Sequence, residues 1–238
     1  MILKEMDSNQ NLFASHITKS FSRGKKKVLA DATFTARDGE CIGILGANGC
    51  GKSTLLSILA GIQSPDSGSV VLNNQDLLSA AKHKGIAERV GYVPQECPLI
   101  EELSAQDNLK LWYCDSPLSL EQELANGFLG MLGIPDFLNV CVKHMSGGMK
   151  KRLSIGCAIA HHPHVLLLDE PGAALDMICK ERIEVYLRNY KKQGNIIVLA
   201  THEEREINMC DKLYILKNGI LEPFTYDGNI HTLVHHFV

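Results

Sequence analysis

The sequence has no paired cysteines. Its eight cysteines are scattered singly along 238 residues, and no two of them form a C-x-x-C pair. This spacing indicates neither a zinc ribbon nor a disulfide framework, and single cysteines are typical of proteins in a reducing cytoplasm. Every uncharged apolar stretch is shorter than the ~18 residues that a membrane-spanning helix needs. The N-terminus also lacks the apolar segment of a secretory signal. We therefore expect a soluble, cytoplasmic protein.

The sequence also has no excess of basic residues. The formal net charge of −3 argues against a nucleic-acid-binding surface, which is usually basic. One basic run, RGKKK at residues 23–27, is short enough to be a solvated turn. The apolar share of 45% can build a substantial core, and we detect no internal repeat or low-complexity tract. A chain of 238 residues is long for one domain and short for two. We therefore expect a single large α/β unit with an inserted subdomain.

Short apolar segments bounded by turns predict strands, and a longer middle region predicts helices. A helix at residues 176–192 is expected between two of the later strands. This alternation of strand and helix implies a largely parallel sheet flanked by helices. The helical middle, residues 104–162, then forms the inserted subdomain. The expected strands are residues 13–17, 28–34, 41–45, 69–72, 90–93, 165–168, 196–201 and 213–216.

The segment GANGCGKST, residues 46–54, fits the phosphate-loop pattern G-x-x-x-x-G-K-[ST]. A predicted strand precedes it and a predicted helix follows it. Glycines let successive backbone N–H groups surround an anion, and the helix start adds its positive dipole end. We therefore predict nucleotide binding, with Lys52 at the β- and γ-phosphates and the Ser53 hydroxyl on Mg²⁺. The expected nucleotide contacts in this loop are Asn48, Gly49, Cys50, Gly51, Lys52, Ser53 and Thr54.

Two carboxylates, Asp169 and Glu170, end the apolar run at residues 165–168. Carboxylates at the C-terminal end of a buried strand lie where α/β sheets bind ligands. We predict that Asp169 holds Mg²⁺, directly or through water. Glu170 is the candidate general base that activates water for attack on the γ-phosphate. The alternative is a strand that ends in a solvated acidic turn, and the phosphate loop favours the catalytic interpretation.

A third motif precedes the carboxylates: residues 145–149 read MSGGM. With this motif the chain resembles the nucleotide-binding domain of ATP-binding-cassette (ABC) ATPases, whose signature L-S-G-G-Q it matches in order and spacing. The resemblance implies that Ser146 and Gly148 contact nucleotide. A Ser-Gly-Gly turn that opens a helix is a backbone anion site by its own physics. Taken alone, however, it would indicate only a serine-capped helix start.

The remaining family elements occur in the same order. The resemblance implies that Gln95 is the Q-loop glutamine, which touches Mg²⁺ and the attacking water and couples the core to the helical subdomain. Residues 172–176, GAALD, resemble the D-loop and contribute Asp176 to nucleotide binding. His202 matches the switch histidine that hydrogen-bonds the γ-phosphate. Phe21 lies where the family has an aromatic residue that stacks on adenine, and we favour this role over the alternative, a core phenylalanine.

The resemblance implies a fold and a domain division. It implies a P-loop NTPase core with a mostly parallel sheet, an N-terminal antiparallel β subdomain and an inserted helical subdomain. The whole chain, residues 1–238, is expected to be one nucleotide-binding domain. Residues 12–95 and 163–222 would form its ATP-binding core, and residues 96–162 its helical signature subdomain.

The resemblance also implies a function. The chain is expected to be the Mg²⁺-dependent ATPase subunit of an ABC transporter, with ATP bound between two nucleotide-binding subunits of a homodimer or heterodimer. A separate transmembrane permease would be the partner, at the cytoplasmic face of the cell membrane. Residues 106–111 and 210–219 look most like exporter-type subunits of bacterial transporters.

The alternative is an ABC ATPase without transport function, acting in DNA repair, chromosome organisation, translation or regulation. Such proteins usually carry a coiled-coil insertion, a second cassette or a basic surface, and these are not evident here, so no nucleic-acid partner is expected. Two positions depart from the family pattern. Met149 replaces the signature glutamine, and Gly172 replaces a hydroxyl residue of the D-loop. Because Glu170 and His202 are intact, we expect a hydrolytically competent site.

Overall fold

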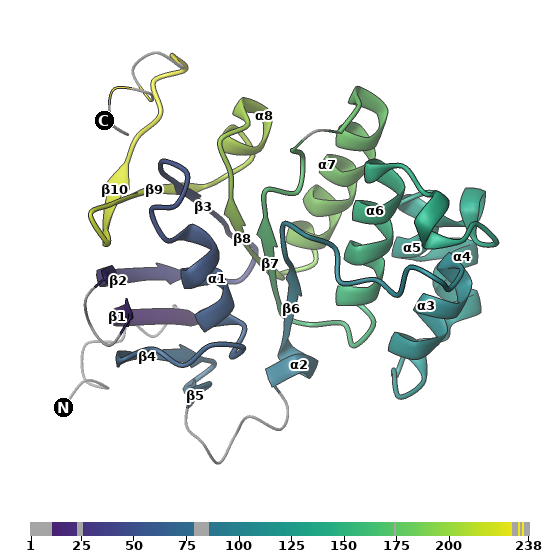
Figure 1. The fold of residues 1–238 in the computed structure, drawn as a ribbon, viewed down its shortest axis with the longest axis horizontal. Coiled ribbons are helices and arrows are strands. Elements are labelled where there is room, and N and C mark those ends of the chain that lie inside the picture. The colour runs from purple at the N-terminus through teal and green to yellow at the C-terminus, as the bar shows by residue number, and fades with distance from the viewer. Residues whose placement is uncertain are drawn as a thin grey trace.

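The computed structural model describes residues 11–22, 26–78, 86–173, 175–229, 233 and 235. These residues form a ten-stranded sheet in the order β5-β4-β1-β2-β10-β9-β3-β8-β7-β6 (Figure 1). The strands are β1 Leu12–Phe21, β2 Lys26–Ala36, β3 Cys41–Leu45, β4 Ser67–Leu72, β5 Gln75–Asp76, β6 Val90–Val93, β7 Val165–Asp169, β8 Ile196–Ala200, β9 Lys212–Lys217 and β10 Ile220–Phe224.

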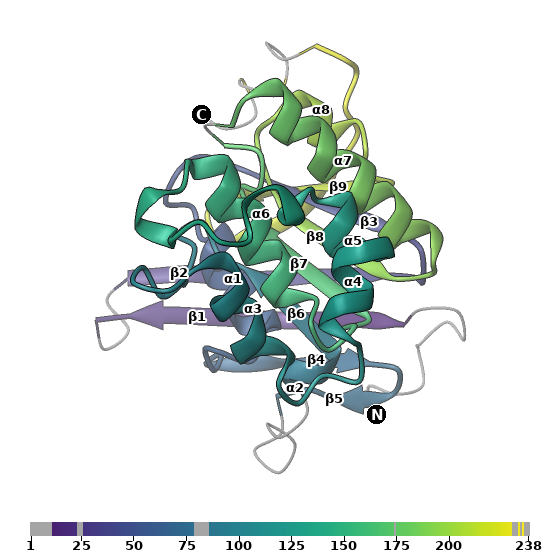
Figure 2. The same ribbon diagram turned by 90° about the vertical axis from the view of Figure 1, so that its right-hand side faces the viewer.

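Helices cover the centre of the sheet and gather at one side of the molecule. Figures 1 and 2 show α3 to α6 on the side away from strands β1 and β4. Two short 3-10 helices, Ile134–Phe137 and Val142–His144, lie between α5 and α6. The α-helices are α1 Lys52–Leu59, α2 Ile86–Arg89, α3 Ala105–Tyr113, α4 Leu120–Asn126, α5 Phe128–Met131, α6 Gly147–Ala158, α7 Met177–Lys192 and α8 Glu204–Ile207.

The sheet has a parallel and an antiparallel part. Strands β6, β7, β8, β3 and β9 pair in parallel, whereas β1 pairs antiparallel with both β2 and β4. Strand β10 joins the two parts, since Ile220 pairs in parallel with Asp31 of β2 and β10 runs antiparallel to β9. The fold class is therefore the predicted one, a mixed α/β fold with a mostly parallel central sheet. The short strands β5 and β10 were not predicted.

The central strands separate two hydrophobic clusters. All five residues of each of β3, β7 and β8 are buried, as expected for strands covered on both faces. Their side chains alternate between the clusters: Leu167 of β7 packs with α1 in the first, while its neighbours Leu166 and Leu168 pack with α6 and α7 in the second. This alternation follows from the two-residue repeat of a strand, and it holds the two layers of helices on opposite faces of one rigid sheet.

The ends of the strands set the position of the functional motifs. The phosphate loop follows β3, residues 94–97 follow β6, and Glu170 and His202 follow β7 and β8. Because these strands are parallel neighbours, their carboxyl ends meet at one edge of the sheet. No helix of the described residues is long and apolar enough to cross a membrane.

Candidate functional site

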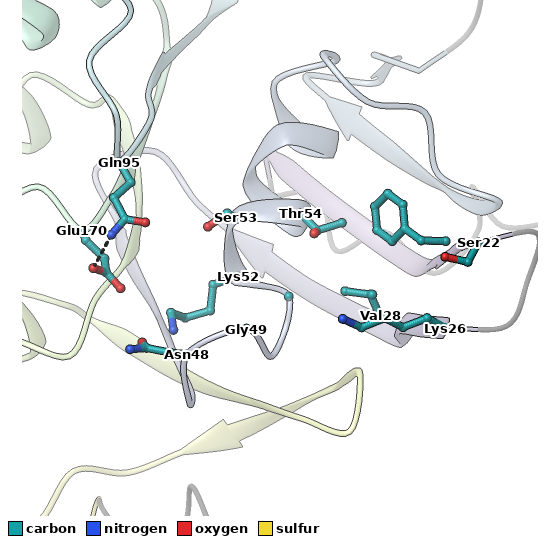
Figure 3. Close-up of a pocket in the computed structure, with 12 residues that line it drawn as sticks. Ser22, Lys26, Val28, Asn48, Gly49, Lys52, Ser53, Thr54, Gln95 and Glu170 are labelled. Carbon is teal, nitrogen blue, oxygen red and sulfur yellow. Dashed lines mark hydrogen bonds between the residues drawn. The ribbon is translucent and has the colours of Figure 1, made fainter.

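A pocket of about 670 Å³ lies over the phosphate loop (Figure 3). In Figure 3, Gln95 and Glu170 lie at one end of this pocket and Lys26 at the other, with Lys52 and Ser53 between them. The pocket is lined by Phe21, Ser22, Lys26, Val28, Asn48, Gly49, Gly51, Lys52, Ser53, Thr54, Gln95 and Glu170.

Two glycines give the phosphate loop its tight path. Gly46 has φ +151°, and a Cβ there would lie 2.7 Å from the Leu216 carbonyl oxygen, so a side chain cannot fit. Gly51 has φ +118°, in the left-handed region that glycine tolerates, and it is the N-cap of α1. The loop therefore passes directly from the buried strand β3 into α1, whose first residue is Lys52. Helix N-termini of this kind attract anions.

Lys52 is buried at the base of the loop, with 6% of its surface exposed. Its ammonium nitrogen donates to the Gly46 carbonyl oxygen at 2.8 Å and to the Ala47 carbonyl oxygen at 3.2 Å. The side chain also lines the pocket. The cation therefore lies within the wall of the pocket at the turn that the sequence assigns to phosphate, and phosphate oxygens would compete with these two carbonyls for its protons.

Ser53 and Asp169 meet beside Lys52. The Ser53 hydroxyl lies near enough to Asp169 to lower the pKa of its carboxyl group, and Asp169 is 2% exposed. Burial raises the pKa of Asp169, and the neighbouring Glu170 raises it further, while Ser53 and Lys52 act in the opposite direction. Hydroxyl and carboxylate oxygens are ligands that Mg²⁺ prefers, so this pair fits the predicted metal. The described residues contain no group of three His, Cys, Asp or Glu side chains with metal-binding geometry.

Glu170 contacts the other two predicted catalytic side chains. Gln95 Nε2 donates to Glu170 Oε2 at 3.3 Å, and His202 Nδ1 lies 3.6 Å from Glu170 Oε1. The backbone of Glu170 has φ +47°, a conformation that is uncommon for a residue with a side chain and clusters at functional sites. The structure thus brings the three predicted catalytic residues together from three strand ends.

The far end of the pocket contains Phe21 and three residues that the sequence did not indicate. Phe21 is 36% exposed, and the Lys19 ammonium lies 5.7 Å from its ring centroid. The three unpredicted residues are Ser22, Lys26 and Val28. Lys26 belongs to the basic run at residues 23–27, of which residues 23–25 lie outside the described part of the chain. The basic run that includes Lys26 follows Phe21 closely in the sequence, and Lys26 pairs with Phe21 across strands β1 and β2. The sequence therefore contained an indication of Lys26.

The signature and the D-loop lie outside this pocket. Ser146 is the exposed N-cap of α6 and accepts a hydrogen bond from the Met149 N–H at 3.2 Å. Asp176 caps α7 in the same way, accepting from the Cys179 N–H at 2.8 Å. A Cβ on Gly148 would lie 2.5 Å from the Cys179 sulfur. The two motifs therefore meet at Cys179 of the same chain, and neither lines the phosphate-loop pocket.

The structure also shows what surrounds Cys50 of the phosphate loop and the two residues that depart from the family pattern, Met149 and Gly172. Cys50 is half-buried and packs against the hydrophobic cluster around α1, and it does not line the phosphate-loop pocket. The Met149 side chain packs into the cluster around α6 and α7, which explains how an apolar residue is accommodated there. A Cβ on Gly172 would lie 2.5 Å from Glu206 Oε1. The absence of a side chain at Gly172 therefore makes room for the half-buried carboxyl group of Glu206.

Comparison with known proteins identifies the family. The ABC transporter family profile matches residues 29–173. The chain is 35% identical over 216 residues to Nod factor export ATP-binding protein I of Bradyrhizobium diazoefficiens, covering 89% of this chain and 69% of that protein. It is 32% identical over 211 residues to the lipopolysaccharide export system ATP-binding protein LptB of Acidithiobacillus ferridurans, covering 87% of each.

A solved structure agrees with this assignment. The ATP-binding cassette MJ0796, in a dimeric post-hydrolysis state bound to ADP and Pi, matches with a TM-score of 0.80 and 27% sequence identity, covering 89% of this chain and 96% of that one. The phosphate loop, the carboxylate pair and the signature occur here on the fold of that cassette. The chain therefore belongs to the ABC transporter family, as an ATP-binding cassette that hydrolyses ATP.

Proposed function

We propose that this chain drives an ABC transporter by ATP-dependent closure of a dimer of nucleotide-binding subunits. The observation that carries the proposal is the assembly around Glu170, where Gln95 and His202 meet the end of the phosphate-loop pocket. The relatives named above are transporter ATP-binding proteins by name. We also propose the domain division in which residues 96–162 form a signature subdomain inserted between the two parts of the ATP-binding core.

Within one subunit, each side chain has a proposed role in hydrolysis. The loop N–H groups and Lys52 bind the β- and γ-phosphates. Ser53, Asp169 and Gln95 would hold Mg²⁺, which neutralises phosphate charge when bound. Glu170 accepts a proton from the attacking water, and His202 donates a hydrogen bond to the γ-phosphate. Phe21 would stack on the adenine ring, with Lys26 beside it.

The second half of the site is proposed to come from another subunit. Ser146, Gly148 and Asp176 do not line the pocket of their own chain, although the signature presents a helix N-terminus suited to an anion. A dimer would place this turn against the nucleotide of its partner. The dimeric form of the related cassette MJ0796 supports this arrangement. Whether the partner is a second copy or a related chain, closure would couple ATP binding to movement.

The proposed membrane partner is a separate permease subunit. The apolar side chains of Ile100, Leu111 and Trp112 are 46%, 53% and 44% exposed. Asn108 ties Ile100 to α3, because the Asn108 side chain exchanges hydrogen bonds with the Ile100 N–H and carbonyl. These side chains lie on or beside α3, in the segment that follows the Q-loop residue Gln95, and they offer apolar surface to a cytoplasmic helix of a permease. The chain would then be peripheral at the cytoplasmic face of the membrane.

Co-purification tests the transport role. The tagged chain would be isolated from its own cells after detergent extraction, and its partners identified by mass spectrometry. We expect a multi-span membrane protein in stoichiometric amount, lost when Trp112 and Leu111 are both replaced by Asp. Recovery with ribosomes or nucleic acid, and without a membrane protein, would instead support an ABC ATPase that moves no substrate.

A further inference from the structure

Three consecutive basic residues of helix α6 have three different environments. Lys150 is partly exposed and pairs with Glu101 at 3.2 Å. Arg152 is 8% exposed and donates to the Leu132 carbonyl oxygen at 2.7 Å, inside the helical segment. Lys151 is 5% exposed. Of the three, Lys151 is the one whose described hydrogen-bond partners lie outside residues 96–162.

Lys151 binds the backbone of the Q-loop. Its ammonium nitrogen donates to the Pro94 carbonyl oxygen at 3.0 Å and to the Gln95 carbonyl oxygen at 3.2 Å. Among the described residues, no carboxylate lies within ion-pair distance of this cation. The two carbonyls belong to consecutive residues directly after β6, so one side chain fixes two adjacent peptide groups at the start of the loop.

Holding helix α6 against the end of β6 with a buried ammonium group costs free energy. Burial lowers the pKa of Lys151, although the charges of Cys97, Asp169, Glu206 and Glu170 act in the opposite direction. A buried ammonium without a carboxylate costs free energy that an apolar side chain of similar size would not. Stability alone therefore does not account for a lysine here, whereas fixing the direction of two carbonyl groups does.

Within one chain, the contact completes a path from the signature, which would face the nucleotide of the partner, to the catalytic residues of the chain's own pocket. Ser146 caps the helix that contains Lys151, five positions further on, which is about 7.5 Å along the helix axis. Lys151 holds the Gln95 backbone, and the Gln95 side chain donates to Glu170. We propose that Lys151 is a positioning residue that fixes the Q-loop to the signature helix, so that Gln95 reaches Glu170 only when the signature helix is in place. The proposal deepens the proposed function and rests on the role assigned there to Gln95.

The test compares Lys151→Met, which keeps the length of the side chain but removes the donor, with Lys151→Arg, which can donate to both carbonyls. Loss of a charged donor corresponds to about a tenfold effect. We expect kcat for ATP to fall about tenfold in Lys151→Met while KM changes by less than about twofold. Amide hydrogen exchange at residues 95–97, measured on the full chain without nucleotide, should accelerate about tenfold. Lys151→Arg should restore both values to within about twofold of wild type.

Lys150→Met is the matched control, since it removes the neighbouring, partly exposed cation from the same helix. It should leave kcat and the exchange at residues 95–97 unchanged. If Lys151→Met does not fold, Lys151→Gln, too short to reach both carbonyls, replaces it with the same expected result. Wild-type kcat together with wild-type exchange in Lys151→Met, or in Lys151→Gln where that variant replaces it, would overturn the proposal. A wild-type chain without ATPase activity would contradict the proposed function, while exchange at residues 95–97 would still decide the role of Lys151.

Discussion

A buried lysine donates to two consecutive backbone carbonyls of the phosphate loop, and a second buried lysine, on helix α6, does the same at the Q-loop. Lys52 is 6% exposed and donates to the carbonyls of Gly46 and Ala47, and Lys151 is 5% exposed and donates to those of Pro94 and Gln95. The positive charges of both lysines also lower the pKa of Asp169. The two lysines differ in their access to the pocket, because Lys52 lines it and Lys151 does not.

This difference separates binding from positioning. A cation in the pocket wall can transfer its hydrogen bonds from the loop to a phosphate, which is the direct role toward ATP that we propose for Lys52. A cation enclosed between a helix and a loop can act only through the groups that it holds. The same local arrangement, an ammonium on two carbonyls, therefore serves two purposes according to its exposure to the pocket.

Replacing Lys52 with Ala should have the largest effect on ATP hydrolysis, because it removes the one of the two lysines that lines the pocket. Because the ammonium is the charge closest to the assigned phosphate position, we expect kcat/KM for ATP to fall about a thousandfold, with loss of ATP binding in equilibrium titrations. The circular dichroism spectrum should remain that of the wild type. A Lys52→Ala variant that hydrolyses ATP at the wild-type rate would show that the loop does not bind the phosphates.

Glu170→Gln should affect hydrolysis and spare binding. The amide retains the size of the side chain and can still bond to Gln95 and His202, but it cannot accept a proton from water. We expect kcat to fall about a hundredfold, with Mg-ATP still bound and an ATP-dependent dimer accumulating on size-exclusion chromatography. Hydrolysis within a few-fold of wild type would move the general base to another residue.

Glu206 extends the comparison from buried cations to a half-buried carboxyl group. It accepts a hydrogen bond from the Thr201 hydroxyl, next to His202, and its Oε1 lies close to Gly172 of the D-loop. Burial raises the pKa of Glu206 to about 7, and the charge of Glu203 adds to this, while Thr201, Gly172 and Lys180 act in the opposite direction. The folded chain therefore binds more protons at this carboxyl than the unfolded chain does between about pH 4.5 and pH 7.

This linkage predicts an effect of pH on stability and not on catalysis. The contribution of Glu206 to stability falls as the pH rises through this range, by at most about 3 kcal/mol. Glu206→Gln lacks the titrating group, so its free energy of unfolding relative to wild type should increase from pH 5 to pH 8 in urea titrations. Glu204→Gln, an exposed change on the same helix, should show no such increase. Equal pH dependence in wild type and Glu206→Gln would refute the role assigned to burial.

The sequence predicted the phosphate loop, the carboxylate pair and the central strands because each depends on local order along the chain. A strand, a glycine-rich turn and a helix start must follow one another, and residues 41–54 show this directly. Lys151 and Glu206 were not predicted, since nothing local distinguishes Lys151 from Lys150 or Glu206 from Glu204. Their burial is decided by β6 and by Gly172, which reach them only through the tertiary fold.

Short strands were also missed for a physical reason. Strand β5 has two residues, and β10 includes Pro223 and alternates weakly in hydrophobicity. Proline cannot donate to the strand ladder, so the sequence of β10 reads as a loop until β9 is placed beside it. The contribution of Lys26 to the pocket depended in the same way on the position of β2 beside the phosphate loop.

The central claim is that two chains share each ATP site, and complementation tests it most directly. Ser146→Arg and Lys52→Ala should each be nearly inactive alone. Mixed in equal amounts, about half of the randomly formed dimers would contain one site that joins an intact Lys52 to an intact Ser146 from the other chain. We predict that ATPase activity returns on mixing, with an ATP-dependent dimer in the Glu170→Gln background. A wild-type rate for Ser146→Arg alone, in a chain that stays monomeric with ATP, would contradict the claim.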